Sequence, residues 1–301
     1  MEHREARMKE LMKLIVRWTL PIPVRRWLQA RWYSRVDCPP AGWVSFGHLR
    51  RLTPLSRVWG CDRGRPIDRY YIERFLSEHA QDIRGHVLEI ADNNYTRKFG
   101  GERVTQSDVL HAVPGNPQAT IVADLTCAEN IPSSTFDCII CTQTVLFIYN
   151  VRAAIWTLYR ILRPGGSLLV TFPGICQISR YAMDRWGDYW RFTSLSGRLL
   201  FEEFFPKANV EVRAHGNVLA ATAFLYGMAV EDIRQEELDY YDPDYEVSIT
   251  AKVVKPESVP YGSVALEDCA KPRARSGGVL PSILLIFAQF SAIAPCIDTL
   301  F

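Results

Sequence analysis

The sequence lacks the short motifs that would identify several classes of enzyme by themselves. Its 301 residues contain no G-x-G-x-x-G, no G-x-x-x-x-G-K-[ST] loop and no internal repeat. A dinucleotide dehydrogenase, a nucleotide hydrolase and a repeat protein are therefore poorly supported. The six histidines show no H-x-H or H-E-x-x-H spacing, so we predict no metal site.

The N-terminus lacks the uninterrupted apolar run that a secretory signal needs, because Lys13 and Arg17 break it, and we expect none. Residues 7–20 instead predict an amphipathic helix. Its apolar side carries Leu11, Leu14, Ile15 and Trp18. Residues 1–69 hold 15 Lys and Arg against 6 Asp and Glu. This basic leader favours an anionic partner such as a membrane surface, and a helix packed on its own domain or on a partner is the alternative.

Closely spaced cysteines are almost absent, although the chain has eight. The one C-x-x-C pair, Cys138 and Cys141, lies in the mostly apolar run at 136–141. If this run is a strand, residues three apart point to opposite faces, so the two thiols can share neither a metal nor a disulfide. We expect both to be buried and reduced, as in a cytosolic protein.

A hydrophobic content of 48% allows the chain to bury a full core. Composition divides it into a basic extension at 1–66, a domain at 67–255, and a linker with an apolar tail at 256–301. The tail includes 19 residues without a charge, 279–297, which follow a basic stretch. A membrane anchor is one interpretation of this tail, and a segment that once led into a further module is the other.

The stretch GHVLEIADNNYT at 85–96 organises the domain. Residues 87–90 predict a buried strand that ends in a tight loop, and such loops bind ligands in open α/β sheets. Nineteen residues after Glu89, Asp108 closes a second predicted strand at 103–107, a spacing suited to the two hydroxyl groups of a ribose. Asp124 ends a third predicted strand, at 119–123.

Further elements follow at intervals typical of alternating strands and helices. Periodicity predicts helices at 66–78, 151–163 and 217–230, and strands at 136–141, 167–172, 210–214 and 246–254. Pro164, Gly165 and Gly166 end the second of these helices.

The segment RILRPGGSLLVTFPG at 160–174 resembles the helix, Pro-Gly-Gly turn and fifth strand of the class I S-adenosylmethionine (SAM) dependent methyltransferases, particularly the small-molecule branch called type 11. The family's first motif is an acid followed by alternating glycines. It falls on Glu89, Ala91, Asn93 and Tyr95, so the acid is present and the glycines are not. Ala and Tyr tolerate φ > 0 poorly. Either the loop follows a different path or cofactor binding is weakened.

The resemblance implies a three-layer Rossmann-like α/β fold at 67–255, with a seven-stranded, mostly parallel sheet of order 3-2-1-4-5-7-6 and one antiparallel strand. It implies SAM as the cofactor, with Asp124 at the adenine and Thr142 beside the reactive sulfonium. The implied cofactor-binding residues are Glu89, Ala91, Asp92, Asn93, Asp108, Val109, Asp124, Leu125, Thr142 and Gln143.

The acceptor is expected beside WGDYWRFT at 186–193, since a similar segment follows the fifth strand in many type 11 relatives. Aromatic rings beside a carboxylate and a guanidinium would suit a sugar or another polyol, or would simply pack the loop down. By the same analogy Tyr71 lies on a helix that covers the cofactor pocket, with core packing as the alternative. The expected substrate-binding residues are Tyr71, Tyr189, Trp190 and Arg191.

These observations lead to one functional hypothesis and two alternatives. We expect a cytoplasmic SAM-dependent methyltransferase that acts at oxygen on a small-molecule or glycan-like acceptor, as in polysaccharide biosynthesis. Asp188 or His215 would accept the hydroxyl proton, and an ordinary loop acid or surface histidine is the alternative for each. The functional alternatives are a non-catalytic module with this fold and a membrane-associated partner of glycan enzymes. The Asn-Pro-Pro-aromatic signature of DNA amino-methyltransferases is missing, and we expect no nucleic-acid partner.

Overall fold

The computed structural model describes residues 21, 24 and 44–257. The predicted amphipathic helix and the apolar tail fall outside these residues. The chain divides into two units, Met1–Thr53 and Pro54–Phe301. In the described part of the first unit a short 3-10 turn, η1, spans Gly47–Leu49. None of the helices in the described ranges is long and apolar enough to cross a membrane.

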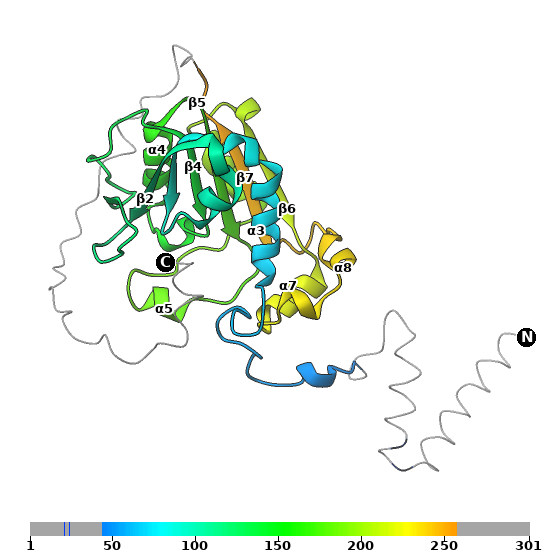
Figure 1. Ribbon diagram of the computed structural model, residues 1–301. Coiled ribbons are helices and arrows are strands. Elements are labelled where there is room, and N and C mark those ends of the chain that lie inside the picture. The colour runs from blue at the N-terminus through cyan, green and yellow to red at the C-terminus, as the bar shows by residue number, and fades with distance from the viewer. Residues whose placement is uncertain (1–20, 22–23, 25–43, 258–301) are drawn as a thin grey trace, which may run out of the picture. The chain divides into compact units, whose positions relative to one another are not determined.

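The second unit is built on a sheet of seven strands in the order β3-β2-β1-β4-β5-β7-β6 (Figure 1). Strands β3, β2, β1, β4 and β5 pair in parallel, and β7 pairs antiparallel with both β5 and β6. The bounds are β1 Gly85–Ile90, β2 Val104–His111, β3 Ile121–Val122, β4 Phe136–Thr142, β5 Leu162–Pro173, β6 Val210–His215 and β7 Ser248–Val254. The strand order and the antiparallel β7 confirm the fold predicted from the sequence.

Helices connect the strands and cover both faces of the sheet (Figure 1). The α-helices are α3 Ile67–Glu78, α4 Val151–Ile161, α5 Arg180–Met183, α6 Ser194–Glu202, α7 Val218–Leu225 and α8 Gln235–Asp239. Shorter turns are η2 Ala80–Asp82, η4 Gly101–Arg103, η5 Val145–Phe147, η6 Lys207–Asn209 and η7 Val230–Asp232, and η3 Thr96–Gly100 is a π-helix. Residues 54–66 pack on this unit, because the N–H of Leu55 donates to the carbonyl of Tyr226 over 2.7 Å and Pro66 forms a β-bridge with Ala229.

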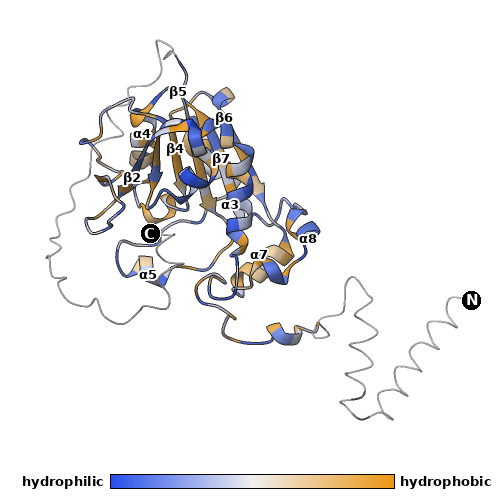
Figure 2. Cartoon of the chain, viewed as in Figure 1, coloured by the Kyte–Doolittle hydropathy of each residue, from blue (hydrophilic) through white to orange (hydrophobic). Residues whose placement is uncertain are grey.

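The two faces of the sheet bury separate apolar clusters. One cluster packs under α4 and α6 and includes Leu158 and Phe201, and the other packs under α3 and includes Phe75. Full burial of such side chains contributes about 1.5–3 kcal/mol each. Strand β4 is hydrophobic along most of its length (Figure 2) and feeds both clusters. Cys141 belongs to the first cluster and Cys138 to the second, and both are free, so their predicted opposite orientation is confirmed.

Several of the predicted boundaries are wrong. The helix predicted at 151–163 ends at Ile161, and β5 begins at Leu162 and includes the Pro-Gly-Gly turn that was predicted to end the helix. The second strand does not end before Asp108 but continues to His111, because Val109 and Leu110 are buried apolar residues that pair with β1. The helix predicted at 217–230 ends at Leu225. A glycine with φ of 68°, Gly227, follows it and closes the helix in the way that a left-handed residue after the last turn usually does.

A buried lysine joins the last strand to the end of α4. Lys255 directly follows β7 and is 7% exposed. Its Nζ donates to the carbonyl oxygens of Tyr159, over 2.9 Å, and Leu162, over 2.7 Å. Both carbonyl groups lie at the C-terminal end of α4, where helical carbonyls have no N–H partner and a positive charge is favourable.

Lys255→Met should lower the free energy of unfolding by about 2–3 kcal/mol, because it removes two charge-assisted hydrogen bonds and leaves two buried carbonyl groups without a donor. Urea denaturation followed by circular dichroism measures this loss. Lys207→Met is the matched control, since that side chain is 82% exposed and its Nζ lies 3.7 Å from the carboxylate of Glu202. We expect the control to change stability by less than about 0.5 kcal/mol. Equal effects of the two substitutions would contradict the anchoring role of Lys255.

Candidate functional site

The sheet has its topological switch point between β1 and β4, where the strand order reverses. Two non-glycine residues adopt positive φ directly after these two strands, Ala91 at 80° and Gln143 at 47°. Among the described residues four non-glycine residues have positive φ, and a third of them, Trp59 at 57°, lines the adjoining pocket. Such backbone costs on the order of 1–3 kcal/mol per residue and gathers at functional sites. This edge of the sheet is therefore the candidate site.

The carboxylate of Glu89 organises the loop after β1. Its side chain is buried, with 2% of the residue exposed. It accepts hydrogen bonds from the backbone N–H groups of Tyr95, over 3.2 Å, and Thr96, over 2.7 Å, and from Oγ1 of Thr96, over 2.7 Å. These N–H groups lie at the start of η3, so an acid on the neighbouring strand satisfies donors that a helix leaves unpaired. Residues 91–95 are thereby closed into a short loop.

Only the first of the three glycine positions needs the conformation that glycine provides. Ala91 adopts it, and its N–H donates to the carbonyl of Leu110 over 2.9 Å. Tyr95 has an ordinary helical φ of −73°. The residues with positive φ in the described chain do not include Asn93. The loop thus keeps a left-handed residue at its first position without glycine.

Two buried carboxyl groups, Glu89 and Asp92, lie at this loop. Burial raises the pKa of Glu89, the hydrogen bonds from Thr96 oppose that change, and the charge of Asp92 adds to it. Asp92 is 6% exposed, and its Oδ1 accepts the N–H of Asn94 over 2.8 Å. The hydrogen-bond donors on both carboxylates are uncharged, so the loop suits a positively charged ligand.

A second loop lies against the first. Nδ2 of Asn116 donates to the carbonyl of Ala91 over 2.7 Å, which joins the connection between β2 and β3 to the loop after β1. Nδ2 of Asn93 lies 3.4 Å from Oγ of Ser107. In the described part of the chain, Oδ1 of Asn93 is buried and has no hydrogen-bond partner. One acceptor at this loop is therefore unsatisfied.

Asp108 lies within β2, opposite Leu88 of β1 and three residues before the strand ends. Its Oδ2 lies 2.6 Å from Nε2 of His86, near the start of β1, and 3.3 Å from Nε2 of Gln106. Burial disfavours its charge, but hydrogen bonds from His86 and Thr120 outweigh burial and lower the pKa of Asp108. The carboxylate is directed away from the loop after β1, so this geometry gives no support to the predicted ribose contact.

The other predicted cofactor residues on β2 and after β3 differ in exposure. Val109 and Leu125 are buried, at 1% and 4% exposed, and contribute side chains to the interior. Asp124 is exposed, and its Oδ1 accepts the N–H of Thr126 over 2.8 Å. Of these three residues, Asp124 is the one whose side chain a ligand can reach.

The end of β4 is fixed by hydrogen bonds from β5. Thr142 is the last residue of β4 and pairs with Thr171. The N–H of Gln143 lies 3.1 Å from both the carbonyl oxygen and Oγ1 of Thr171. These bonds hold Gln143 in its left-handed conformation at the switch point.

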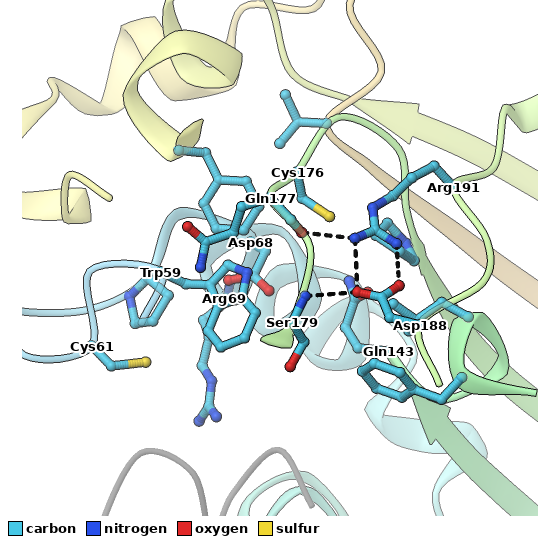
Figure 3. Close-up of a pocket in the computed structure, with 16 residues that line it drawn as sticks. Trp59, Cys61, Asp68, Arg69, Gln143, Cys176, Gln177, Ser179, Asp188 and Arg191 are labelled. Atoms are coloured by element: carbon cyan, nitrogen blue, oxygen red, sulfur yellow. Dashed lines mark hydrogen bonds and ion pairs between the residues drawn. The ribbon is translucent and has the colours of Figure 1, made fainter. Parts of the chain in front are cut away.

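A pocket lies beside Gln143, between the ends of β4 and β5 and the start of α3 (Figure 3). Its wall combines aromatic, polar and charged side chains. They include Trp59, Asp68, Arg69, Gln143, Phe147, Gln177, Asp188, Arg191 and Phe224. Two residues predicted to contact the acceptor or the proton, Arg191 and Asp188, thus meet Gln143 from the predicted cofactor set.

Asp188 and Arg191 form a bidentate ion pair on one side of the pocket (Figure 3). Nη1 and Nη2 of Arg191 lie 2.6 and 3.0 Å from the two carboxylate oxygens, and the side chain of Asp188 is 1% exposed. The N–H of Ser179 donates to Asp188 over 2.7 Å, and Arg191 donates to the carbonyl of Gln177 over 2.7 Å. The pair therefore fastens two parts of the loop between β5 and α6 to each other.

Tyr189 and Trp190 lie beside the pocket and are 44% and 38% exposed. Their N–H groups donate to the carbonyl of Leu146, a pocket residue, over 3.0 and 3.3 Å. Nε1 of Trp190 donates to the carbonyl of Ile148 over 3.0 Å, and its ring stacks on exposed Tyr149 with centres 5.9 Å apart. Backbone contacts thus hold these aromatic rings in place while part of their surface remains in solvent.

The rings of Tyr71 and His215 pack against each other, and neither residue is among those that line the pocket. Their rings stack with centres 5.6 Å apart and an interplanar angle of 19°. Tyr71 is 2% exposed and donates to the carbonyl of Leu238 over 3.0 Å, while Nε2 of His215 lies 3.0 Å from Oγ1 of Thr250. Burial lowers the pKa of His215 to about 4. Both side chains belong to the packing between α3 and the last two strands.

Sequence analysis does not identify Trp59, Asp68 and Gln177 as pocket residues. Trp59 comes from the basic extension at 1–66, for which no site was predicted, and Gln177 follows β5 in a loop without a motif. Asp68 does carry a usable signal, because it is an acid in the first turn of the helix predicted to cover the pocket, three residues before Tyr71.

Ala91→Gly should raise the free energy of unfolding by about 1 kcal/mol, because glycine adopts positive φ without the steric cost that alanine has there. Thermal or urea unfolding of the full chain measures the change. Ala153→Gly is the matched control, because Ala153 lies inside α4, where the same replacement should lower stability by about 1 kcal/mol. Similar losses in both variants would show that Ala91 is not strained.

Part of the chain matches a known protein family. Residues 59–170 match the family model described as "Methyltransferase domain". No relative among the curated proteins matches the chain.

Several solved structures are similar at low identity. The cyclase SpnF is 15% identical over 62% of this chain and 81% of its own, with a TM-score of 0.40. A SAM-dependent methyltransferase from Archaeoglobus fulgidus is 9% identical over 62% and 94%, with a TM-score of 0.42. The N-methyltransferase NodS from Bradyrhizobium japonicum, in complex with S-adenosylhomocysteine (SAH), is 15% identical over 65% and 90%, with a TM-score of 0.41. Residues 59–170 are thus similar to a methyltransferase domain, and the sheet has the strand order that the resemblance implied.

Proposed function

We propose that this chain is a SAM-dependent methyltransferase that transfers the methyl group of SAM to a hydroxyl group of a small-molecule or glycan-like acceptor. The observation that carries the proposal is the place of the pocket, which adjoins Gln143 at the switch point of the sheet. SAM supplies a methyl group on a sulfonium, whose leaving group is already good. The protein therefore needs mainly to position the acceptor and, for a hydroxyl, to accept a proton.

The loop after β1 fits SAM, because SAM carries positive charge on its sulfonium and its amino group. Glu89 and Asp92 supply buried negative charge, and their donors on the loop are uncharged. The unsatisfied Oδ1 of Asn93 offers an acceptor for a donor group of the ligand. Together with Gln143, these are the residues that would hold the methionine part of SAM. Ala91, which replaces the first glycine, already has the conformation that the loop requires.

Asp124 is our proposed contact for the adenine, since its carboxylate is exposed where β3 ends. For Asp108 we propose a structural role, because its carboxylate already binds His86 within the sheet. A ribose contact would require Asp108 to leave that partner, at the cost of a strong hydrogen bond.

The pocket wall supports a polyol as the acceptor. Trp59, Phe147 and Phe224 offer flat apolar surfaces, and Gln177 adds an amide that can hydrogen-bond hydroxyl groups. The exposed rings of Tyr189 and Trp190, at the side of the pocket, would extend this surface for a second sugar ring. Such a surface suits an acceptor from polysaccharide biosynthesis.

The Asp188–Arg191 pair shapes this pocket in our proposal. Its internal hydrogen bonds leave it rigid, so it can orient an acceptor hydroxyl without moving. His215 is not assigned to proton transfer, because it is buried beside Tyr71 with Thr250 as its partner.

The full chain should bind SAM and SAH in isothermal titration calorimetry, and Asp92→Asn should weaken SAM binding about 10- to 100-fold by removing a buried negative charge that faces a cation. Asparagine can still accept the N–H of Asn94, so the turn is retained. Asp242→Asn is the matched control, because the half-buried Asp242 makes the same turn with the N–H of Asp244, over 3.0 Å, and does not line the pocket. Equal affinities of all three chains would contradict the assignment of Asp92, and no binding by the wild type would contradict the proposed function.

The acceptor class is tested by incubating the full chain with methyl-tritiated SAM and methyl glycosides of glucose, galactose, mannose and rhamnose. The proposal predicts label in at least one glycoside, attached through oxygen. A chain that binds SAH but labels none of them would contradict a sugar hydroxyl as the acceptor.

A further inference from the structure

Two carboxylates are among the described residues that line the pocket, Asp68 and Asp188 (Figure 3). Asp188 accepts two hydrogen bonds from Arg191 and one from Ser179, all within 3.0 Å. A carboxylate held in this way is a poor proton acceptor, because protonation would disrupt its bonds to a guanidinium. Asp68 accepts the backbone N–H of Arg69 over 2.9 Å. The donor in this contact is an uncharged peptide group, whereas Asp188 is bound by a guanidinium.

The helical position of Asp68 explains why it reaches the pocket. Asp68 stands three residues before Tyr71 and four before Ile72, which are both buried, so the three side chains share the inward side of α3. Because Asp68 belongs to the first turn, it lies at the end of the apolar core and lines the pocket. The start of a helix also favours a carboxylate there.

The charge of Asp68 acts on one residue of the loop after β1 and on one residue of the pocket wall. Burial raises the pKa of Tyr95, and Asp68 and Glu89 both raise it further. Burial also raises the pKa of Cys176, to about 12, and Asp68 and Asp188 add to that change. Tyr95 belongs to the proposed cofactor loop and Cys176 to the wall of the acceptor pocket. Asp68 is therefore close to both.

The proton affinity of Asp68 depends on groups from three elements. Burial raises the pKa of Asp68, and the positive charge of Arg69 on the same helix opposes this change. From other elements, Asp68 interacts electrostatically with Tyr95 after β1 and with Cys176 after β5, and Asp188 and Arg191 line the same pocket. A carboxylate whose anion is destabilised by burial takes a proton more readily than one in water.

We propose that Asp68 is the general base of methyl transfer, an inference that rests on the proposed function. The acceptor hydroxyl donates a hydrogen bond to the Asp68 carboxylate. As the bond between the acceptor oxygen and the methyl carbon forms, the hydroxyl proton passes to Asp68. The electron pair of the breaking carbon–sulfur bond stays on sulfur, which leaves in SAH. Asp68 then releases its proton to water, so each turnover yields one methylated oxygen, one SAH and one proton.

The first test needs no acceptor. A carboxyl group whose pKa the fold raises contributes to stability while it is protonated. This contribution is fully present below the pKa of the unfolded state and is lost as pH rises through the folded pKa. Asp68→Asn in the full chain should therefore keep or raise the melting temperature at pH 8, and the difference should vanish near pH 3. Asp62→Asn is the matched control at an exposed position before α3, and we expect no change at either pH. A clear loss of melting temperature in Asp68→Asn at pH 8 would show that Asp68 stabilises the helix, and would overturn the assignment.

The second test follows turnover of labelled SAM with the methyl glycosides. Asp68→Asn should lower kcat about 100-fold or more with KM changed less than about threefold, and Asp68→Glu should restore part of kcat because it retains a carboxylate. Calorimetry should give SAH affinities within about threefold of wild type for both variants. We expect kcat to rise with pH in the wild type and in Asp62→Asn, and this rise should be absent in Asp68→Asn.

The outcomes separate the base from other roles. An Asp68→Asn chain with nearly full kcat overturns the proposal. An Asp68→Asn chain in which only KM rises also overturns the proposal, because this result would mean that the carboxylate binds a cationic acceptor. A wild-type chain that binds SAH but labels no glycoside removes the hydroxyl acceptor and the base together. A wild-type chain that binds no SAH contradicts the proposed function itself, whatever the stability of Asp68→Asn.

Discussion

The buried carboxylate of Glu89 is the interaction on which the rest of the site depends. It takes two backbone N–H groups and one hydroxyl from the next seven residues, and so fixes how the chain leaves β1. With the loop held from the strand side, the conformation of glycine is needed only at Ala91. Burial raises the pKa of Glu89, so the carboxylate is held at an electrostatic cost that a positively charged cofactor would reduce. The same residue therefore shapes the loop and, in the proposed function, favours the cationic cofactor.

The backbone around this carboxylate is strained at two positions and is held in place by hydrogen bonds. Ala91 and Gln143 hold left-handed backbone at the two strands of the switch point, and hydrogen bonds to Leu110 and Thr171 keep them there. On the acceptor side, the Asp188–Arg191 pair locks the loop after β5. The pocket lies between these fixed parts, which suits a reaction that depends mainly on positioning.

The sequence predicts the fold well because its signals are local and mutually consistent. Apolar runs predict most of the strands, and the resemblance at residues 160–174 implies their order, which the sheet has. The face alternation of Cys138 and Cys141 follows from period two alone. The site is harder to predict. Asp108 has the right spacing, but two buried apolar residues extend its strand and His86 takes its carboxylate, which no spacing rule reveals.

The pocket shows the same limit, because it is assembled by contacts between distant segments. Asp68 reaches the pocket from the start of α3, and Trp59 reaches it from the stretch before that helix. The carboxylate of Asp188 also lines the pocket but is bound by Arg191. The central claim is that this loop without glycines still binds SAM at the carboxyl ends of β1 and β4. A crystal structure of the full chain with SAH tests it most directly. The account predicts SAH over residues 91–94, with its sulfur facing the pocket that Asp68 and Gln143 line. Density for SAH at another edge of the sheet, or none at saturating SAH, would contradict it.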